Sequence, residues 1–292
     1  MIYVKLDNWD YYDDAVVMVK SFYPRVDVKQ FKNGISESDL SQDDFIIEAE
    51  TPIEEGRSKR DVHDEFKKKL YLQLHDKTGI SLPWGYMTGV RPGKNAMIML
   101  EEGKSHKEIY EEFVDRHFVA EKKAELALCV AEKERTILEN MDYKNGYSIY
   151  IGIPFCPTTC LYCSFTSYSL AAYKSKVDTY LEALFKEMEY VSEAMKGRRL
   201  DTIYFGGGTP TTLSEIQLDK VLTKLEQLFN VKDALELTVE AGRPDSITRE
   251  KLKVLKAHNV HRISINPQTM NQETLDLIGR RHTTEQIKEA FK

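Results

Sequence analysis

The stretch Tyr150–Phe165, "YIGIPFCPTTCLYCSF", joins an apolar run to three closely spaced cysteines. Cys156, Cys160 and Cys163 form the pattern C-x3-C-x2-C. The apolar, β-branched residues before the first cysteine predict a β-strand, with the thiols on the loop that follows it. Thiolates are soft ligands that favour zinc, copper(I) or iron–sulfur clusters, so the loop predicts a site for a soft metal.

Three thiols are one fewer than the usual four ligands. Structural zinc normally has four protein ligands, and the histidines that follow the loop begin only at His258. A disulfide would leave the third thiol unpaired. A [4Fe–4S] cluster normally takes four cysteines, so three would leave one iron with an open position for a reacting ligand. We favour the cluster, with zinc and purely structural thiols as the alternatives.

The composition is that of a globular protein. The chain has 292 residues, 41% of them hydrophobic, and a formal net charge of −6, without a basic tail or block. This charge pattern argues against non-specific nucleic-acid binding. There is no long apolar run typical of a transmembrane helix and no secretory signal, so we expect no membrane span and a cytoplasmic location. In the cytosol, clustered cysteines indicate metal binding or catalysis rather than a disulfide.

The pattern of apolar residues changes near residue 147. Residues 1–146 predict a small α+β accessory domain, with short β-rich runs up to residue 55. Its expected helices are 58–78, 104–114 and 118–140, and a further short helix follows the loop in "LPWGYMTGVRPGK". Residues 147–292 alternate between strand-like and helical segments, which predicts βα units and a parallel sheet.

The second half predicts four βα units. The expected strands are 147–153, 201–210, 234–241 and 260–266, and the expected helices are 174–195, 213–229, 247–259, 271–279 and 283–292. Ser214 is a candidate N-cap, as is Thr283 or Thr284. A closed (β/α)₈ barrel typically takes about 250 residues. The fold class that we expect is therefore α/β: a partial (β/α) barrel with parallel strands, or a fragment of a longer protein, preceded by the α+β domain.

With an aromatic residue, Tyr162, before its third cysteine, the loop resembles that of the radical S-adenosylmethionine (SAM) superfamily. The resemblance implies that Cys156, Cys160 and Cys163 bind a [4Fe–4S] cluster whose open iron takes the methionyl group of SAM. In that family an electron from the cluster cleaves SAM and yields a 5′-deoxyadenosyl radical.

Residues at the ends of the other expected strands resemble the same family. "FGGGTP", "TVEAGRP" and "RISINPQTM" each end a strand, and "LIGRRH" follows the last of them. The positions that match family contacts to SAM are Tyr150, Tyr162, Gly207, Gly208, Thr209, Glu240, Gln268 and Arg280. Arg281 is the alternative to Arg280. Taken alone, the glycine run also fits a tight turn, and Glu240 also fits a solvated carboxylate.

Within the superfamily, residues 147–292 most closely resemble the oxygen-independent coproporphyrinogen III oxidase group. "LPWGYMTGVRPGK" resembles the variant of that group with an extra N-terminal domain. The implied reaction is the oxidative decarboxylation of two coproporphyrinogen III propionates to give protoporphyrinogen IX. The implied cofactors are a [4Fe–4S] cluster and SAM, and the implied partners are the tetrapyrrole and an external electron donor such as flavodoxin or ferredoxin.

Phe165 departs from the group's pattern, which often has a further cysteine at this position. Relatives with an aromatic residue there include haem chaperones and haem-modifying or haem-degrading enzymes, so the alternative function is that of a haem-binding chaperone or a haem-modifying radical SAM protein of the same group. The family's C-terminal part, which completes the barrel and much of the tetrapyrrole pocket, has no counterpart in these 292 residues. The fourth cysteine, Cys129, is expected to be a small buried hydrophobic residue on its helix.

Overall fold

A computed structural model describes residues 1–31, 35–36, 38, 40–53, 55–89, 91–139, 141 and 143–292. The chain divides into two compact units, Met1–Asn140 and Met141–Lys292. That the first unit is an accessory domain stays a prediction.

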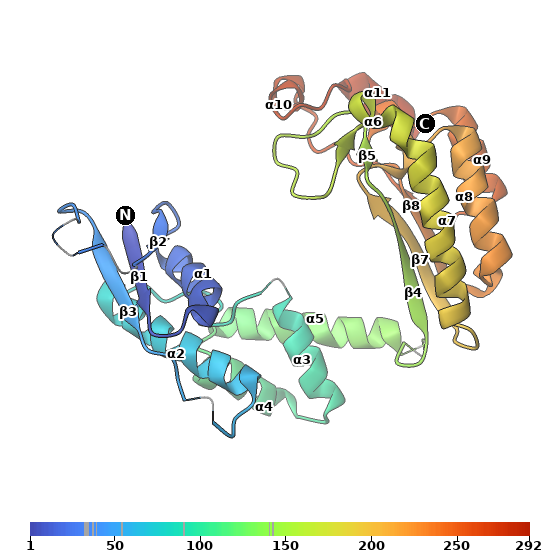
Figure 1. Ribbon diagram of the computed structural model, residues 1–292. Coiled ribbons are helices and arrows are strands. Elements are labelled where there is room, and N and C mark those ends of the chain that lie inside the picture. Colours follow the sequence, from blue (N-terminus) through green and yellow to red (C-terminus); the bar gives the residue numbers. More distant parts are fainter. Residues whose placement is uncertain are drawn as a thin grey trace. The chain divides into compact units, whose positions relative to one another are not determined.

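The first unit contains a three-stranded parallel sheet. β1 (Ile2–Leu6) lies between β2 (Val28–Gln30) and β3 (Phe45–Ala49). Two helices pack together beside it, α1 (Tyr12–Phe22) and α2 (Lys59–Thr78) (Figure 1). We did not expect α1, because residues 1–55 were interpreted as short β-rich runs and acidic loops, but its buried residues recur at helical spacing.

The first unit continues with α3 (Pro92–Glu101), α4 (His106–Glu111), a π-helical turn (Glu112–Arg116) and α5 (Glu121–Leu138). The expectation that Cys129 is buried is wrong, because this side chain is exposed. The buried residues of α5 are Ala124, Ala127 and Ala131. Cys129 is two residues from both Ala127 and Ala131, which places it on the opposite face of the helix.

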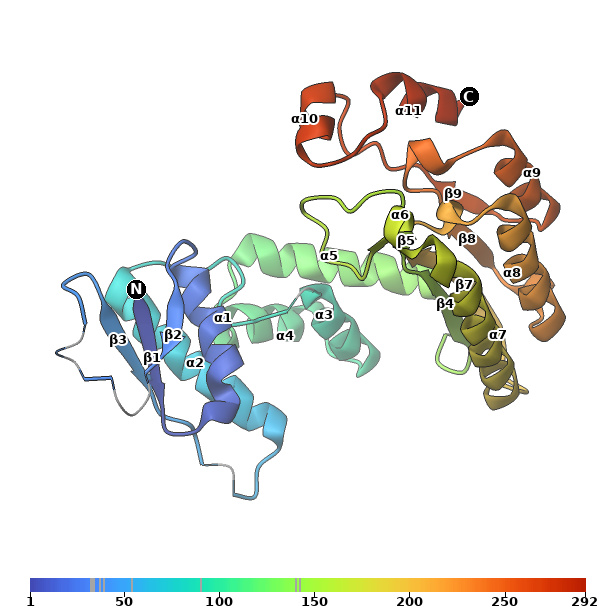
Figure 2. The same cartoon turned by 45° about the horizontal axis from the view of Figure 1, so that its top comes forward.

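The second unit is built on a four-stranded parallel sheet, in the order β4 (Tyr147–Ile153), β7 (Leu200–Gly207), β8 (Glu236–Glu240) and β9 (Arg262–Ser264). Figures 1 and 2 show three helices side by side along this sheet: α7 (Val177–Ala194), α8 (Glu215–Leu228) and α9 (Arg249–Ala257). The predicted α/β class with parallel strands is confirmed.

Alternation along the strands places the hydrophobic core between the sheet and the helices. Ile151 and Ile153 of β4 and Ile203 and Phe205 of β7 are almost fully buried. Tyr150 and Tyr204 alternate with these residues and therefore project from the other face. The sheet thus separates an apolar core from a face on which polar side chains are available for function.

Shorter elements complete the second unit. They are β5 (Phe155–Cys156), β6 (Tyr168–Ser169), α6 (Leu170–Tyr173), α10 (Gln272–Leu277) and α11 (Thr284–Phe291). The predicted cap at Ser214 is confirmed: its hydroxyl accepts from the Gln217 N–H, and the Gln217 side chain accepts from the Ser214 N–H. At α11 the N-cap is Thr283 rather than Thr284.

His258 joins α9 to α8 through two carboxylates. Its Nδ1 lies 2.9 Å from Glu226 and its Nε2 lies 3.0 Å from Asp219. Burial lowers the pKa of His258, but the bonds to the two carboxylates outweigh it and raise the pKa above its ordinary value. A raised folded-state pKa stabilises the fold at pH values below the unfolded-state pKa, and this contribution is lost as the pH rises through the folded-state pKa.

We therefore expect the wild-type chain to lose about 1 kcal/mol of unfolding free energy, relative to His258→Gln, as the pH rises through the His258 pKa. Urea denaturation of both proteins at a series of pH values from 6 to 9 measures this difference. Parallel pH dependences for the two proteins would contradict the assignment.

Among the helices of the described residues, none combines the length and the apolar character required to cross a membrane.

Candidate functional site

The four parallel strands of the second unit end at one edge of the sheet, and the loops after them carry most of the predicted site. Ligands of open α/β sheets bind at such carboxyl ends. The cysteine loop follows β4 and β5, the glycine turn follows β7, Glu240 ends β8, and Gln268 follows β9. This shared edge explains why residues far apart in the sequence come together.

The cysteine loop begins inside the core and ends in solvent. Cys156 is 8% exposed, and Cys160 and Cys163 are half-buried. The N–H of Cys163 donates to the Cys160 carbonyl at 3.0 Å, which closes a turn. Burial raises the pKa of the Cys156 thiol; Thr209 and then Arg243 lower it, while Cys163 and Cys160 raise it further. The thiols of Cys160 and Cys163 therefore lie within electrostatic reach of Cys156.

The glycine turn packs directly on this loop. The N–H of Gly208 donates to the Ile153 carbonyl at 2.8 Å, and that of Thr209 donates to the Phe155 carbonyl at 2.9 Å. A Cβ at Gly208 would lie 2.8 Å from Phe155 O and 3.0 Å from Cys156 Sγ. Gly207 has φ +102°, which L-residues rarely adopt. The turn requires glycine so that the two backbones can meet at Cys156.

The segment after α10 holds the other side of the cysteine loop. Thr158 Oγ1 donates to the Gly279 carbonyl at 2.9 Å, and the Leu161 N–H donates to the Ile278 carbonyl at 3.0 Å. Arg280 is 3% exposed, and its Nη1 lies 3.4 Å from the Tyr162 hydroxyl. The same guanidinium donates through Nη2 to the Gly242 carbonyl at 2.6 Å. Arg280 therefore links the cysteine loop to the end of β8.

The Nε of Arg280 is buried and has no hydrogen-bond partner within the described residues. A buried guanidinium N–H that is left unpaired costs free energy unless a ligand accepts from it. Arg281, the sequence-based alternative, is exposed. Arg280 is thus the arginine of this pair that faces the site.

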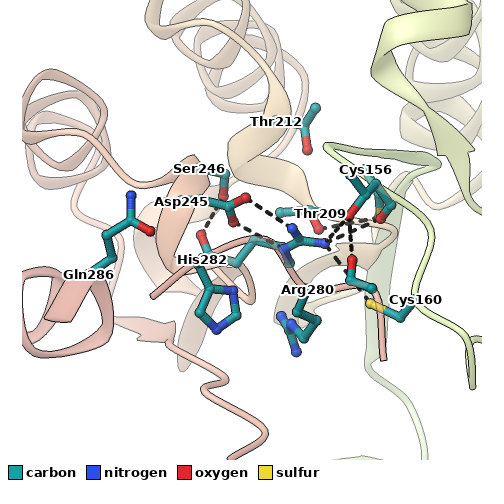
Figure 3. A network of polar contacts seen from close by, with 12 residues as sticks. Cys156, Cys160, Thr209, Thr212, Asp245, Ser246, Arg280, His282 and Gln286 are labelled. Atoms are coloured by element: carbon teal, nitrogen blue, oxygen red, sulfur yellow. Dashed lines mark hydrogen bonds and ion pairs between the residues drawn. The ribbon is translucent and has the colours of Figure 1, made fainter. Parts of the chain in front are cut away.

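Sequence reasoning missed Arg243, which is 2% exposed. Its Nε and Nη2 donate to the two carboxylate oxygens of Asp245 at 3.0 and 2.9 Å. Its Nη1 donates to Thr158 and lies 4.0 Å from Cys160 Sγ. Figure 3 shows Asp245 on one side of this network and Cys156 and Cys160 on the other. In the sequence, "AGRP" reads only as a turn, so nothing marked this arginine as buried.

A second group of polar residues lies on the sheet face opposite the helices. Tyr204 donates its hydroxyl to Glu240, and its ring stacks on Tyr150 at 5.8 Å between centroids. Burial, followed by the contact with Glu240, raises the pKa of Tyr204 to about 12. Tyr204 was missed as well, although its alternation with Ile203 and Phe205 could have placed it on this face.

Gln268 follows β9 at the same edge of the sheet. Its side chain is exposed, and its backbone has φ +66°, in the left-handed region that favours glycine. Within the described part of the chain, Arg280 is joined to Tyr162 and to the Gly242 carbonyl, and Gln268 takes no part in these two contacts. Its role as a SAM contact stays a prediction.

A cavity of about 580 Å³ borders the cysteine loop. It lies beside β4 and the start of α7, and its walls are mostly aromatic. The residues that line it include Tyr150, Phe155, Phe165, Tyr168, Tyr173, Tyr180 and Lys176. Phe165, which is 72% exposed, is part of this wall. Such walls suit a flat apolar ligand.

The three cysteines and the nearby arginines suit a metal cofactor that is bound by thiolates and keeps one position for an exchangeable ligand. Within the described residues, no group of three or more His, Cys, Asp or Glu side chains is arranged so that it could hold a metal ion. The three cysteines nevertheless lie on one loop, beside a glycine turn and two buried arginines. Thiolates favour iron–sulfur clusters, and the unpaired Arg280 Nε suits an anionic ligand. These residues therefore fit a [4Fe–4S] cluster with SAM beside it.

Comparisons with known proteins agree with this chemistry. Residues 150–292 match the family model "Radical SAM superfamily". The chain is 40% identical over 224 residues to the "Oxygen-independent coproporphyrinogen-III oxidase-like protein HemZ" of Bacillus subtilis; the match covers 75% of this chain and 44% of that protein. It is also 40% identical over 146 residues to the "Heme chaperone HemW" of the same organism, covering 50% of this chain and 38% of HemW.

A solved structure described as "Coproporphyrinogen III oxidase (HemN) from Escherichia coli is a Radical SAM enzyme" is 31% identical, with a TM-score of 0.45. That match covers 50% of this chain and 33% of the solved chain. The chain thus spans less than half the length of these relatives. Residues 150–292 therefore form a radical SAM domain, and the chain is similar to the coproporphyrinogen oxidase-like members of that superfamily.

Proposed function

We propose that Cys156, Cys160 and Cys163 hold a [4Fe–4S] cluster, that SAM binds beside it, and that the protein oxidises the propionate side chains of coproporphyrinogen III without oxygen. One observation carries the proposal: the cysteine loop, the glycine turn that packs on Cys156, and the buried side chain of Arg280 lie together at one edge of the sheet. When bound, the cluster supplies the electron that cleaves SAM.

The protein's own residues bind and orient SAM in this proposal. The unpaired Nε of Arg280 is a donor for the carboxylate of SAM, because a guanidinium pairs well with a carboxylate in a buried place. Gly207 and Gly208 leave room for the methionyl amino group to approach the backbone. Glu240 accepts a hydrogen bond from SAM, with Tyr204 fixing the carboxylate from its other side.

The substrate and the electron donor are part of the same proposal. The aromatic cavity beside the loop offers apolar walls for a tetrapyrrole, and Lys176 offers a cation for a propionate. Flavodoxin or ferredoxin is the proposed external electron donor. The radical SAM family and the oxidase-like relatives support this reaction.

The test is a product assay under anaerobic conditions. The chain is reconstituted with iron and sulfide and then incubated with dithionite, SAM and coproporphyrinogen III. The proposal expects 5′-deoxyadenosine and tetrapyrrole products that have lost one or two carboxyl groups, identified by mass spectrometry. A bound cluster with 5′-deoxyadenosine but no decarboxylated tetrapyrrole would reject the substrate, and absence of iron would reject the whole proposal.

A haem chaperone is the second candidate. Phe165 in the cavity wall and the similarity to HemW favour it. A chaperone would bind haem in a stable stoichiometric complex, visible in the Soret absorption, and would form no vinyl product. Haem titration alongside the product assay therefore separates the two functions.

We expect Glu240→Ala to weaken SAM binding about tenfold or more, because a hydrogen bond to a charged group is worth about 1.5–3 kcal/mol. Isothermal titration calorimetry with the reconstituted protein measures the affinity. The iron content should stay at the wild-type level, since Glu240 is not on the cysteine loop. Glu236→Ala, at the other end of the same strand, is the matched control. Loss of iron in Glu240→Ala would mean that the residue is structural.

A further inference from the structure

Arg243 occupies a buried position between the cysteine loop and the end of β8. It is the N-cap residue of the 3₁₀ turn Pro244–Ser246, and its carbonyl accepts from the Ser246 hydroxyl at 2.7 Å. Ser246 in turn shares a 2.6 Å hydrogen bond with Thr211, after the glycine turn. The backbone of Arg243 is therefore fixed by the loop that follows the neighbouring strand.

The guanidinium of Arg243 reaches two sets of acceptors. One edge pairs with both carboxylate oxygens of Asp245, at 3.0 and 2.9 Å. The remaining nitrogen, Nη1, donates to Thr158 Oγ1 at 3.0 Å and to the Thr158 carbonyl at 3.3 Å. Thr158 lies midway between Cys156 and Cys160 in the sequence. Asp245 thus orients the planar guanidinium, and Nη1 on its other side binds Thr158, in the middle of the cysteine loop.

The same nitrogen is 4.0 Å from the sulfur of Cys160. Arg243 is 2% exposed, so solvent screens its charge weakly. Arg280, another buried cation, donates to the carbonyl of Gly242, the residue before Arg243, while Asp245 is the carboxylate that pairs directly with Arg243. Hydrogen bonds to the ligating sulfurs, together with local charge, set the reduction potentials of iron–sulfur clusters.

We propose that Arg243 is a positioning residue that fixes the cysteine loop through Thr158 and raises the reduction potential of the bound cluster, and that Asp245 limits this effect. The inference rests on the proposed cluster, but it does not depend on the substrate. It predicts opposite consequences for two neighbouring substitutions. Removing the cation should make the cluster harder to reduce, and neutralising the carboxylate should make it easier.

The test compares Arg243→Met, Arg243→Lys and Asp245→Asn, each reconstituted anaerobically and titrated with dithionite while the reduced cluster is followed by electron paramagnetic resonance. Iron and sulfide are assayed in the same samples. For Arg243→Met we expect the one-electron reduction equilibrium to fall about tenfold, a shift of about 59 mV to more negative potential. Asp245→Asn should shift the potential in the positive direction. Arg243→Lys keeps the charge and should stay closer to the wild type than Arg243→Met does.

Arg262→Met is the matched control, because Arg262 is 65% exposed and pairs with Glu236 at the amino end of β8. Its potential should equal that of the wild type. The inference would be overturned if the potentials of Arg243→Met and Asp245→Asn were unchanged. It would also be overturned if both potentials shifted in the same direction, because a purely structural disturbance does not depend on the sign of the charge that is removed. If Arg243→Met holds no iron, Asp245→Asn decides: a positive shift supports the inference, and any other result overturns it.

Failure of the proposed cluster is recognised separately. In that case the wild-type chain itself would hold no iron and sulfide after reconstitution, and the inference would fall with it. A wild-type chain with a full cluster, together with variants that do not differ from it, would instead reject only the role of Arg243.

Discussion

Cys160→Ala should assemble no intact cluster, and its iron content after anaerobic reconstitution should fall from about four per chain to near zero. The wild-type ligand set already lacks the usual fourth cysteine, so removal of Cys160 leaves two thiols. Two thiolates leave half of the irons of a cube without a protein ligand. Iron and sulfide assays and the visible absorption spectrum measure the loss.

The rest of the molecule should be little affected by this change. Cys160 is half-buried on a loop and does not belong to either hydrophobic core. Far-ultraviolet circular dichroism and the urea midpoint of the apoprotein should therefore match the wild type. Cys129→Ala is the matched control, because this cysteine is exposed on α5, in the other unit, and its iron content should be unchanged. A Cys160→Ala protein that still bound about four irons would show that the ligand assignment is wrong.

Gly208→Ala should distort the site although it adds only one methyl group. The new Cβ would lie 2.8 Å from Phe155 O and 3.0 Å from both Ile153 O and Cys156 Sγ. The two carbonyls belong to backbone that is fixed by hydrogen bonds from Gly208 and Thr209, so the strain is transmitted to Cys156. We expect a loss of about 1–3 kcal/mol of unfolding free energy, which is typical of overpacking, together with a lower iron content.

Urea denaturation of the apoprotein and an iron assay after reconstitution measure these two effects. The matched control is Gly242→Ala, at the same sheet edge, where a Cβ would meet only Asn266 Cγ, at 3.9 Å. The control should behave like the wild type in both assays. If Gly208→Ala were as stable and as rich in iron as Gly242→Ala, the close contact between the glycine turn and the cysteine loop would be disproved.

The sequence predicts elements well where the apolar pattern is strong. The strand 147–153 and the glycine-ended strand after residue 200 agree with β4 and β7, because alternating apolar residues face the helices. The last strand is shorter than expected, Arg262–Ser264 instead of 260–266. The helix α1 was missed because its acidic residues were interpreted as a loop, although Asp13 and Asp14 in a first turn favour a helix N-terminus.

The cysteine loop was recognisable because its spacing carries chemical information by itself. Arg243 and Tyr204 were not, because their importance comes from contacts across the fold. Arg243 lies 83 residues from Cys160 and 85 from Thr158, and Tyr204 lies 36 residues from Glu240. The direction of such a side chain depends on how neighbouring strands pair, which a local pattern does not contain.

The tether between the cysteine loop and the segment after α10 has a consequence for biosynthesis. Thr158 bonds to a carbonyl 121 residues later in the chain, at Gly279. A ribosome completes Cys163 more than a hundred residues before that anchor exists, and domains are assembled as the chain emerges. During this interval the three thiols are on a nascent chain in which the hydrogen bond between Thr158 and Gly279 has not yet formed. A metal group that requires this tether would therefore be loaded only after Gly279 has been synthesised, and reducing conditions would keep the three thiols available until then.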